Sequence, residues 1–140
     1  MDILKHKNLS VDTWDTWYRI PAWFREAETI DAKIEVLPHS GKGNSTEHSL
    51  ILWSSGTWVS GTWKAGIWID GTWENGAWLG GDWRNGVWKK GTWFDGQWCK
   101  GTWLNGNWYE GNWGSGLWAS GQVNHKKSLG FNNDGRPIWA

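Results

Sequence analysis

The middle of the chain repeats large apolar and small positions with a period of five, which neither a strand nor a helix has. Tryptophan stands at every fifth position from Trp53 to Trp118, and glycine at every fifth position from Gly56 to Gly121. A plain strand would send successive tryptophans to opposite faces, because its side chains alternate with a period of two. The unit G-x-W-x-x therefore predicts short strands with a turn in every unit.

A four-sided β-helix satisfies this period. Each pentad forms one wall, in which the glycine and the tryptophan point inward and the residue between them points outward. The last two residues turn the corner, and four walls make a coil of twenty residues. A small inward neighbour leaves room for a large ring at native packing density. In this geometry Cys99 lies in an outward column with Val59, Leu79 and Ala119.

The repeat over residues 51–123 resembles the pentapeptide-repeat family, whose unit places a small residue two positions before a large apolar one. Here tryptophan replaces the usual Leu or Phe, and glycine replaces the usual Ala. The predicted fold is all-β: a right-handed quadrilateral β-helix, or solenoid, with an inward Trp ladder and a cap at both ends. The ladder residues are Trp58, Trp63, Trp68, Trp73, Trp78, Trp83, Trp88, Trp93, Trp98, Trp103, Trp108 and Trp113.

Turn signals within the repeat support a second architecture. Asn-Gly or Asp-Gly pairs begin at Asn75, Asn85, Asp95 and Asn105, and such pairs favour two-residue β-hairpin turns. The segment "YEGNW" at residues 109–113 resembles part of a MORN repeat, a β-hairpin family. The alternative is therefore a MORN-like β-hairpin meander. It would place every repeat tryptophan on one face, which a partner would have to cover.

The repeat divides the chain into three parts. Residues 1–50 form an N-terminal cap or docking region, residues 51–123 the solenoid, and residues 124–140 a C-terminal cap that carries a turn signal at Asn133-Asp134-Gly135. Stacked repeats need caps, because the last unit would otherwise expose its core. The N-terminal region also holds aromatic residues outside the repeat. These candidates for a protein interface, or for a cap over the first coil, are Trp14, Trp17, Trp23 and Phe24.

Composition argues for a binding or structural role. The chain has 18 Trp and 20 Gly, and its 14 basic residues balance its 14 acidic residues. A net charge of zero provides no field that would attract nucleic acid or an anionic membrane. Cys99 is the single cysteine, and the four histidines have no spacing typical of metal ligands. We expect no catalytic residues, no cofactor and no metal, and therefore no enzyme.

The N-terminal sequence has no apolar run typical of a secretory signal, and no stretch is long and apolar enough to span a membrane. Strings of G-x-W-x-x also resemble uncharacterised repeat proteins of large tailed bacteriophages. This resemblance implies a structural component of a particle, such as a spacer, plug or decoration. Its partners would be virion subunits or copies of itself, in the virion or in the cytoplasm of an infected host cell. The alternative is a glycan-binding or host-attachment module with an exposed aromatic face.

Overall fold

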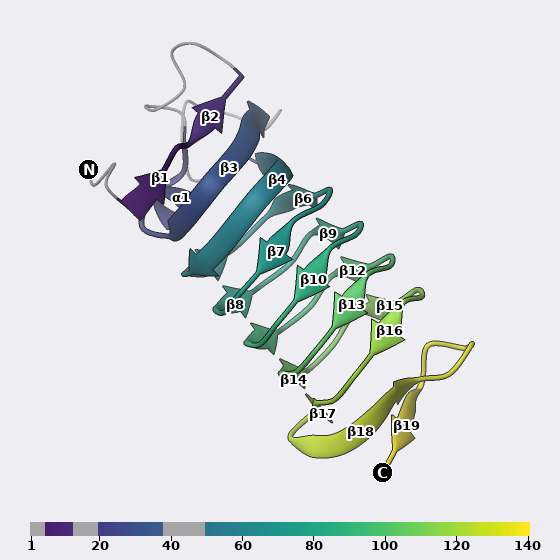
Figure 1. Cartoon of the computed structure of the whole chain (residues 1–140). Helices are drawn as coiled ribbons and strands as arrows, with labels where there is room; N and C mark the ends of the chain where they lie inside the picture. Colours follow the sequence, from purple (N-terminus) through teal and green to yellow (C-terminus); the bar gives the residue numbers. More distant parts are fainter. Residues whose placement is uncertain (1–4, 13–19, 38–49) are drawn as a thin grey trace.

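The computed structural model describes residues 5–12, 20–37 and 50–140, which form a β-solenoid of about five turns (Figure 1). Before the repeat lie β1 (His6–Lys7), β2 (Ser10–Val11), α1 (Ala22–Arg25) and β3 (Glu28–Leu37). The repeat contains β4 (Leu50–Ser60), β5 (Thr62–Trp63), β6 (Gly66–Trp68), β7 (Thr72–Trp73), β8 (Ala77–Trp78), β9 (Asp82–Trp83), β10 (Val87–Trp88), β11 (Thr92–Trp93), β12 (Gln97–Trp98), β13 (Thr102–Trp103), β14 (Asn107–Trp108), β15 (Asn112–Trp113), β16 (Leu117–Trp118) and β17 (Gln122–Val123). The chain ends in β18 (Lys126–Phe131) and β19 (Pro137–Trp139).

The coil has three walls. Each strand of the repeat pairs in parallel with the strand fifteen residues along the chain, so that Trp73 lies between Trp58 and Trp88. Three pentads therefore complete one coil. The predicted β-solenoid with a buried tryptophan ladder is confirmed, but its four walls and its twenty-residue coil are wrong. The hairpin meander is also wrong, because the strands between β4 and β17 pair in parallel.

The three walls belong to two sheets, because β4 runs across two walls. The first wall contains the first half of β4 with β6, β9, β12 and β15, and the second wall contains its second half with β7, β10, β13 and β16. The third wall contains β5, β8, β11, β14 and β17, and β18 and β19 extend its sheet. In Figure 1 the coils lie one below another from β4 to β17.

Backbone hydrogen bonds join each pentad to the previous coil at two points. In the pentad of Trp93, the Thr92 N–H donates to the Gly76 carbonyl at 3.0 Å, and the Phe94 N–H donates to the Trp78 carbonyl at 2.8 Å. The same pair of bonds recurs along the repeat. The Asn-Gly and Asp-Gly pairs form corners of the coil. At one such corner, the Gly96 N–H donates to Asp95 Oδ1 at 2.8 Å.

The glycine of the pentad is required by the backbone. Gly91 has a φ of +121°, which L side chains rarely adopt, and a Cβ placed on it would lie 2.4 Å from the Gly76 carbonyl oxygen. All fourteen repeat glycines have a positive φ, between +113° and +140°. We expected glycine here because a small residue leaves room for the large inward ring. The structure shows a different cause: the backbone at this corner lies very close to the backbone at the corner of the previous coil.

The tryptophan side chains form three columns that run along the solenoid. Rings fifteen residues apart stack face to face, with centroids 4.5 to 5.0 Å apart and planes within 7° of parallel. Rings five residues apart meet edge to face, with centroids 5.7 to 6.0 Å apart. Eleven rings, from Trp53 to Trp103, have no exposed surface. These columns are the core of the solenoid.

Three indole rings fill one coil, which explains the number of walls. Trp73 and Trp78 are 5.9 Å apart, a typical distance for an edge-to-face aromatic pair. In a square of four rings with this side, opposite rings would be about 8 Å apart, beyond the ~4.5–7 Å range of aromatic contact. A four-sided coil would therefore leave a gap along its axis, and the triangular coil has direct contact between all three columns.

The described residues before the repeat pair with and contact the first coil. Strand β3 runs antiparallel to β4 along the first two walls, and β1 and β2 pair with β3. Phe24 of α1 contacts the rings of Trp53 and Trp58, and Trp23 contacts Trp63 edge to face at 5.3 Å. Side chains from α1 thus lie on one ring of each tryptophan column.

The residues after the repeat pair with and contact the last coil. Strand β18 runs antiparallel to β17, and Phe131 stacks on Trp113 with centroids 5.2 Å apart, at the end of the first tryptophan column. The predicted turn at residues 133–135 is confirmed between β18 and β19, where the Gly135 N–H donates to the Asn132 carbonyl at 3.0 Å. Ile138 and Trp139 of β19 are 42% and 50% exposed.

Candidate interaction surfaces

Two of the four predicted interface residues, Trp23 and Phe24, lie within the described structure. Trp14 and Trp17 lie outside the described residues. Phe24 is fully buried and Trp23 is 5% exposed, and both contact the first coil. These two rings are therefore part of the core. The predicted ladder residues, from Trp58 to Trp113, are all buried.

A buried histidine fixes the position of Phe24. The His6 ring stacks on the Phe24 ring, with centroids 4.9 Å apart and planes 4° from parallel. Its Nε2 lies 3.2 Å from the Arg25 carbonyl oxygen, and its Nδ1 lies 2.9 Å from the Thr29 hydroxyl. Because a carbonyl can only accept, a neutral His6 carries its proton on Nε2 and accepts at Nδ1 from Thr29. The sequence does not indicate this role of His6, because its hydrogen-bond partners Arg25 and Thr29 are 19 and 23 residues further along the chain.

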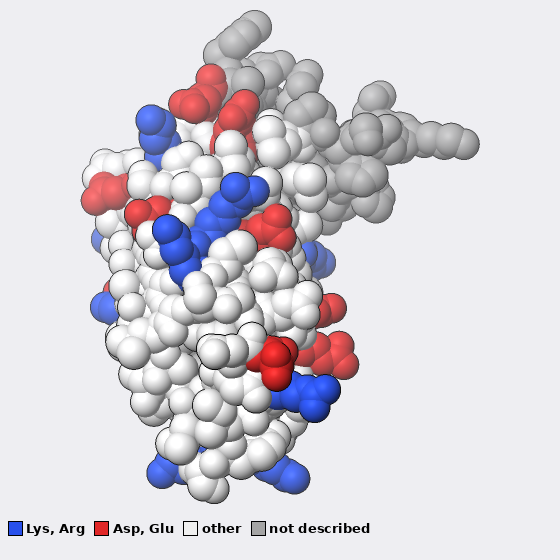
Figure 2. Space-filling model, turned by 90° about the vertical axis from the view of Figure 1, so that its right-hand side faces the viewer, with Lys and Arg blue, Asp and Glu red and all other residues white. Residues whose placement is uncertain are grey.

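Apart from Asp82 in β9, the charged residues of the repeat lie at the corners of the solenoid. The residues that point outward from the second and third walls are uncharged: Thr57, Thr72, Val87, Thr102 and Leu117, and Thr62, Ala77, Thr92, Asn107 and Gln122. At one corner, Lys89 and Glu74 form an ion pair at 3.8 Å with both side chains about half exposed. On the face drawn in Figure 2, acidic and basic side chains are interspersed and uncharged surface predominates.

One corner carries an exposed apolar ridge formed by Leu79, Phe94 and Tyr109. Phe94 and Tyr109 stack on each other, with centroids 5.2 Å apart and planes within 9° of parallel. One face of each ring is therefore in contact with the other ring. A sugar-binding platform needs an aromatic face that is open to solvent, and the eleven rings without exposed surface in the columns offer none.

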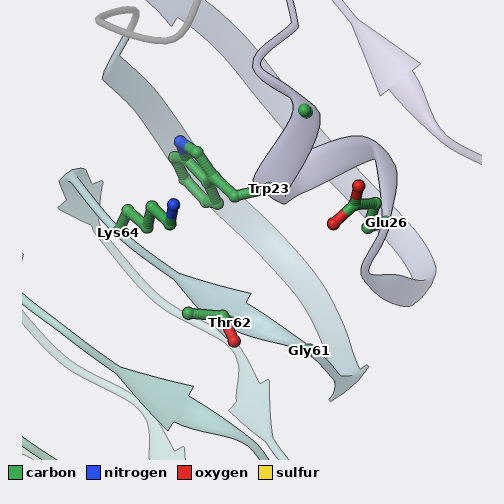
Figure 3. Close-up of a pocket in the computed structure, with 6 residues that line it drawn as sticks. Trp23, Glu26, Gly61, Thr62 and Lys64 are labelled. Carbon is green, nitrogen blue, oxygen red and sulfur yellow. The ribbon is translucent and has the colours of Figure 1, made fainter.

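A hollow of about 450 Å³ lies between α1 and the first coil of the third wall. Its lining residues come from both sides: Ala22, Trp23 and Glu26 from the helix and its end, and Gly61, Thr62 and Lys64 from the wall (Figure 3). Lys64 and Glu26 are both exposed and opposite in charge. This mixture gives the hollow no preference for one sign of ligand charge.

A second hollow, which we call the polar groove, lies near the other end of the third wall and has a volume of about 530 Å³. Its lining residues are Lys90, Asn105, Gly106, Asn107, Ser120, Gly121, Gln122 and Lys127. The set contains two lysines, three carboxamides and one hydroxyl, and no carboxylate. The sequence alone does not indicate this groove. Lys90, Asn105 and Ser120 form a column only in a coil of fifteen residues, and a coil of twenty residues was expected.

Among residues 5–12, 20–37 and 50–140, no group of three or more His, Cys, Asp or Glu side chains is placed to hold a metal ion. In the same part of the chain, no helix is long and apolar enough to cross a membrane. Cys99 is a free, partly buried thiol. In the fifteen-residue coil, Cys99 is in register with Arg84 of the previous coil and with Gly114 of the next coil. Its predicted column with Val59, Leu79 and Ala119 is therefore wrong.

Comparisons with models of known protein families, with curated proteins and with solved structures give no match.

Proposed function

We propose that this protein is a non-enzymatic structural or assembly component, a rigid β-solenoid that serves as a spacer, plug or decoration in a larger particle. The observation that supports this proposal is the continuous core, in which every coil stacks on the next through three indole rings. Each pentad also hydrogen-bonds to the previous coil at two points. Rigid bodies of this kind hold other parts at a fixed distance.

A bacteriophage particle is the proposed setting. This part of the proposal depends on the likeness of the G-x-W-x-x strings to repeat proteins of large tailed bacteriophages. The proposed partners are other virion subunits or further copies of the chain. A mass-spectrometric inventory of purified particles from the source tests the setting: we expect the protein at a constant copy number per particle. Its consistent absence from particles would reject this setting.

We propose that docking uses the N-terminal region, through Trp14 and Trp17. The support is that Trp23 and Phe24 are already buried against the first coil, which leaves two of the four N-terminal candidates for a partner. The full-length variant Trp14→Ala/Trp17→Ala should keep the circular dichroism of the native protein and lose assembly into its particle. Lys7→Ala, a change at an exposed position in β1, is the control. Normal assembly of the double variant would reject this docking site.

The alternative function, glycan binding at a host surface, needs a site other than the tryptophan columns. In these columns the faces of the tryptophan rings stack on one another within the core. A glycan could instead be held by hydrogen bonds and charge.

A further inference from the structure

We propose that the polar groove binds an acidic oligosaccharide. The groove lies on the outside of the solenoid, separate from the N-terminal region assigned to docking. It runs along the axis of the solenoid, from Lys90 at the corner before β11, across β14 and β17, to β18 of the same sheet. Neighbouring strands are about 4.8 Å apart, so Lys90 and Lys127 lie roughly 14 Å apart along the axis. A ligand in this groove is therefore extended and follows the axis.

The hydrogen bonds within the protein determine which groups the groove can offer. Asn105 Oδ1 accepts from the Gly106 N–H at 2.9 Å, and Asn107 Oδ1 accepts from the His125 N–H at 3.0 Å. The Ser120 hydroxyl donates to the Leu104 carbonyl at 2.8 Å. One acceptor position on each of two carboxamide oxygens and one hydroxyl proton are thus already used. Each asparagine keeps N–H donors and one acceptor position, and the two lysines add only donors.

An excess of donors selects a ligand that is rich in acceptors and negatively charged. Neither Lys90 nor Lys127 has an ion pair with a carboxylate among the described residues. Carboxamides and a hydroxyl, which suit the hydroxyl groups of a sugar, outnumber the two ammonium groups. No aromatic side chain lines the groove, so it lacks the stacking surface that single-stranded nucleic acids use. The best fit is a saccharide with carboxylates that are spaced along its chain.

The asparagine in the middle of the groove is held in place. Besides the bond from the His125 backbone, Asn107 Nδ2 lies 3.4 Å from His125 Nδ1. His125 Nε2 is in turn 2.5 Å from the Tyr109 hydroxyl, and the two rings meet edge to face. A side chain fixed in this way loses little entropy when a ligand binds. Tyr109 and His125 are therefore positioning residues for the groove.

The test uses the full-length protein and three probes: tetramannuronate, which is a carboxylated tetrasaccharide, neutral cellotetraose, and tripolyphosphate. Isothermal titration calorimetry measures affinity, and side-chain amide signals in 15N-edited NMR spectra locate the site. We expect tetramannuronate to bind with a Kd of about 1 mM or tighter and to shift the amide signals of Asn105 and Asn107. Cellotetraose should bind at least tenfold more weakly, and added salt should weaken the uronate complex.

The variant Lys90→Gln/Lys127→Gln should weaken tetramannuronate binding about tenfold, since two exposed ionic contacts are lost. Lys64→Gln/Lys100→Gln makes the same change in net charge outside the groove and should leave affinity unchanged. Equal weakening in both variants would overturn the proposal, because it would indicate attraction by overall charge. The lack of saturable uronate binding up to 5-fold above that Kd would also overturn it. Equally tight binding of tripolyphosphate would overturn the assignment to a saccharide.

Discussion

Replacement of Gly91 by alanine tests why glycine occurs in every pentad. A Cβ at Gly91 would lie 2.4 Å from the Gly76 carbonyl oxygen and 3.0 Å from the Gly76 nitrogen, both of which are backbone atoms that cannot rotate away. The φ of +121° is itself strained for alanine. The variant must therefore distort its own backbone and separate two coils at this corner.

Three costs add up in Gly91→Ala. Backbone strain at an unfavourable φ costs about 1–3 kcal/mol, and overpacking a tight site costs a further ~1–3 kcal/mol. Separation of the coils weakens the bond from the Thr92 N–H to the Gly76 carbonyl, which contributes about 1 kcal/mol. The expected loss in the free energy of unfolding is about 3–7 kcal/mol. For a chain of this length, that corresponds to a fall in Tm of roughly 10–25 °C.

Gly80→Ala is the matched control. Gly80 lies outside the G-x-W-x-x glycine series and has no positive φ, and the nearest atom to an added Cβ is the Lys64 carbonyl oxygen at 3.7 Å. Alanine there should leave stability unchanged or raise it by up to ~1 kcal/mol, because it restricts the unfolded chain. Urea denaturation and thermal melts of the two variants measure the difference. Equal stability of the two variants would refute the claim that backbone conformation and close backbone contact require glycine in every pentad.

The other predictions concern the core, its C-terminal end and the surface. Acrylamide should quench the tryptophan emission of the native protein weakly, and the emission should be blue-shifted, since eleven repeat rings have no exposed surface; strong quenching would contradict the buried columns. Phe131→Ala should cost about 2–3 kcal/mol because it uncovers Trp113, whereas Leu129→Ala, at an exposed site, should cost little; similar melting temperatures would show that Phe131 does not protect the core. Glu74→Gln should change stability by less than ~0.5 kcal/mol, because its ion pair with Lys89 is half exposed, and a larger loss in a urea melt would give that pair a structural role.

The sequence predicted the solenoid and the buried tryptophans because a period of five allows few other arrangements. The number of walls was not predictable in the same way, since every pentad has the same pattern and can occupy any wall. The size of three indole rings in contact determines it, and that is a property of packing. Two pairs fifteen residues apart carried a signal for the true coil: Glu74 with Lys89, and Phe94 with Tyr109.

The ends of the solenoid and the groove were harder to predict. Trp23 and Phe24 are apolar in either role, as a cap or as an interface, and the sequence does not show that both rings contact the first coil. The polar groove is formed by residues from several coils. Its members have no common motif, so the sequence alone gave no reason to group Lys90 with Lys127.

The central claim is that a coil contains three walls and fifteen residues, with the tryptophans stacked at that spacing. NMR spectroscopy of uniformly 13C,15N-labelled protein tests it through nuclear Overhauser effects between backbone protons of neighbouring strands. The structure predicts parallel contacts that connect Thr72 and Trp73 with Val87 and Trp88, and the same fifteen-residue spacing along the repeat. Contacts at a spacing of twenty residues, or an antiparallel pattern between consecutive pentads, would contradict the account.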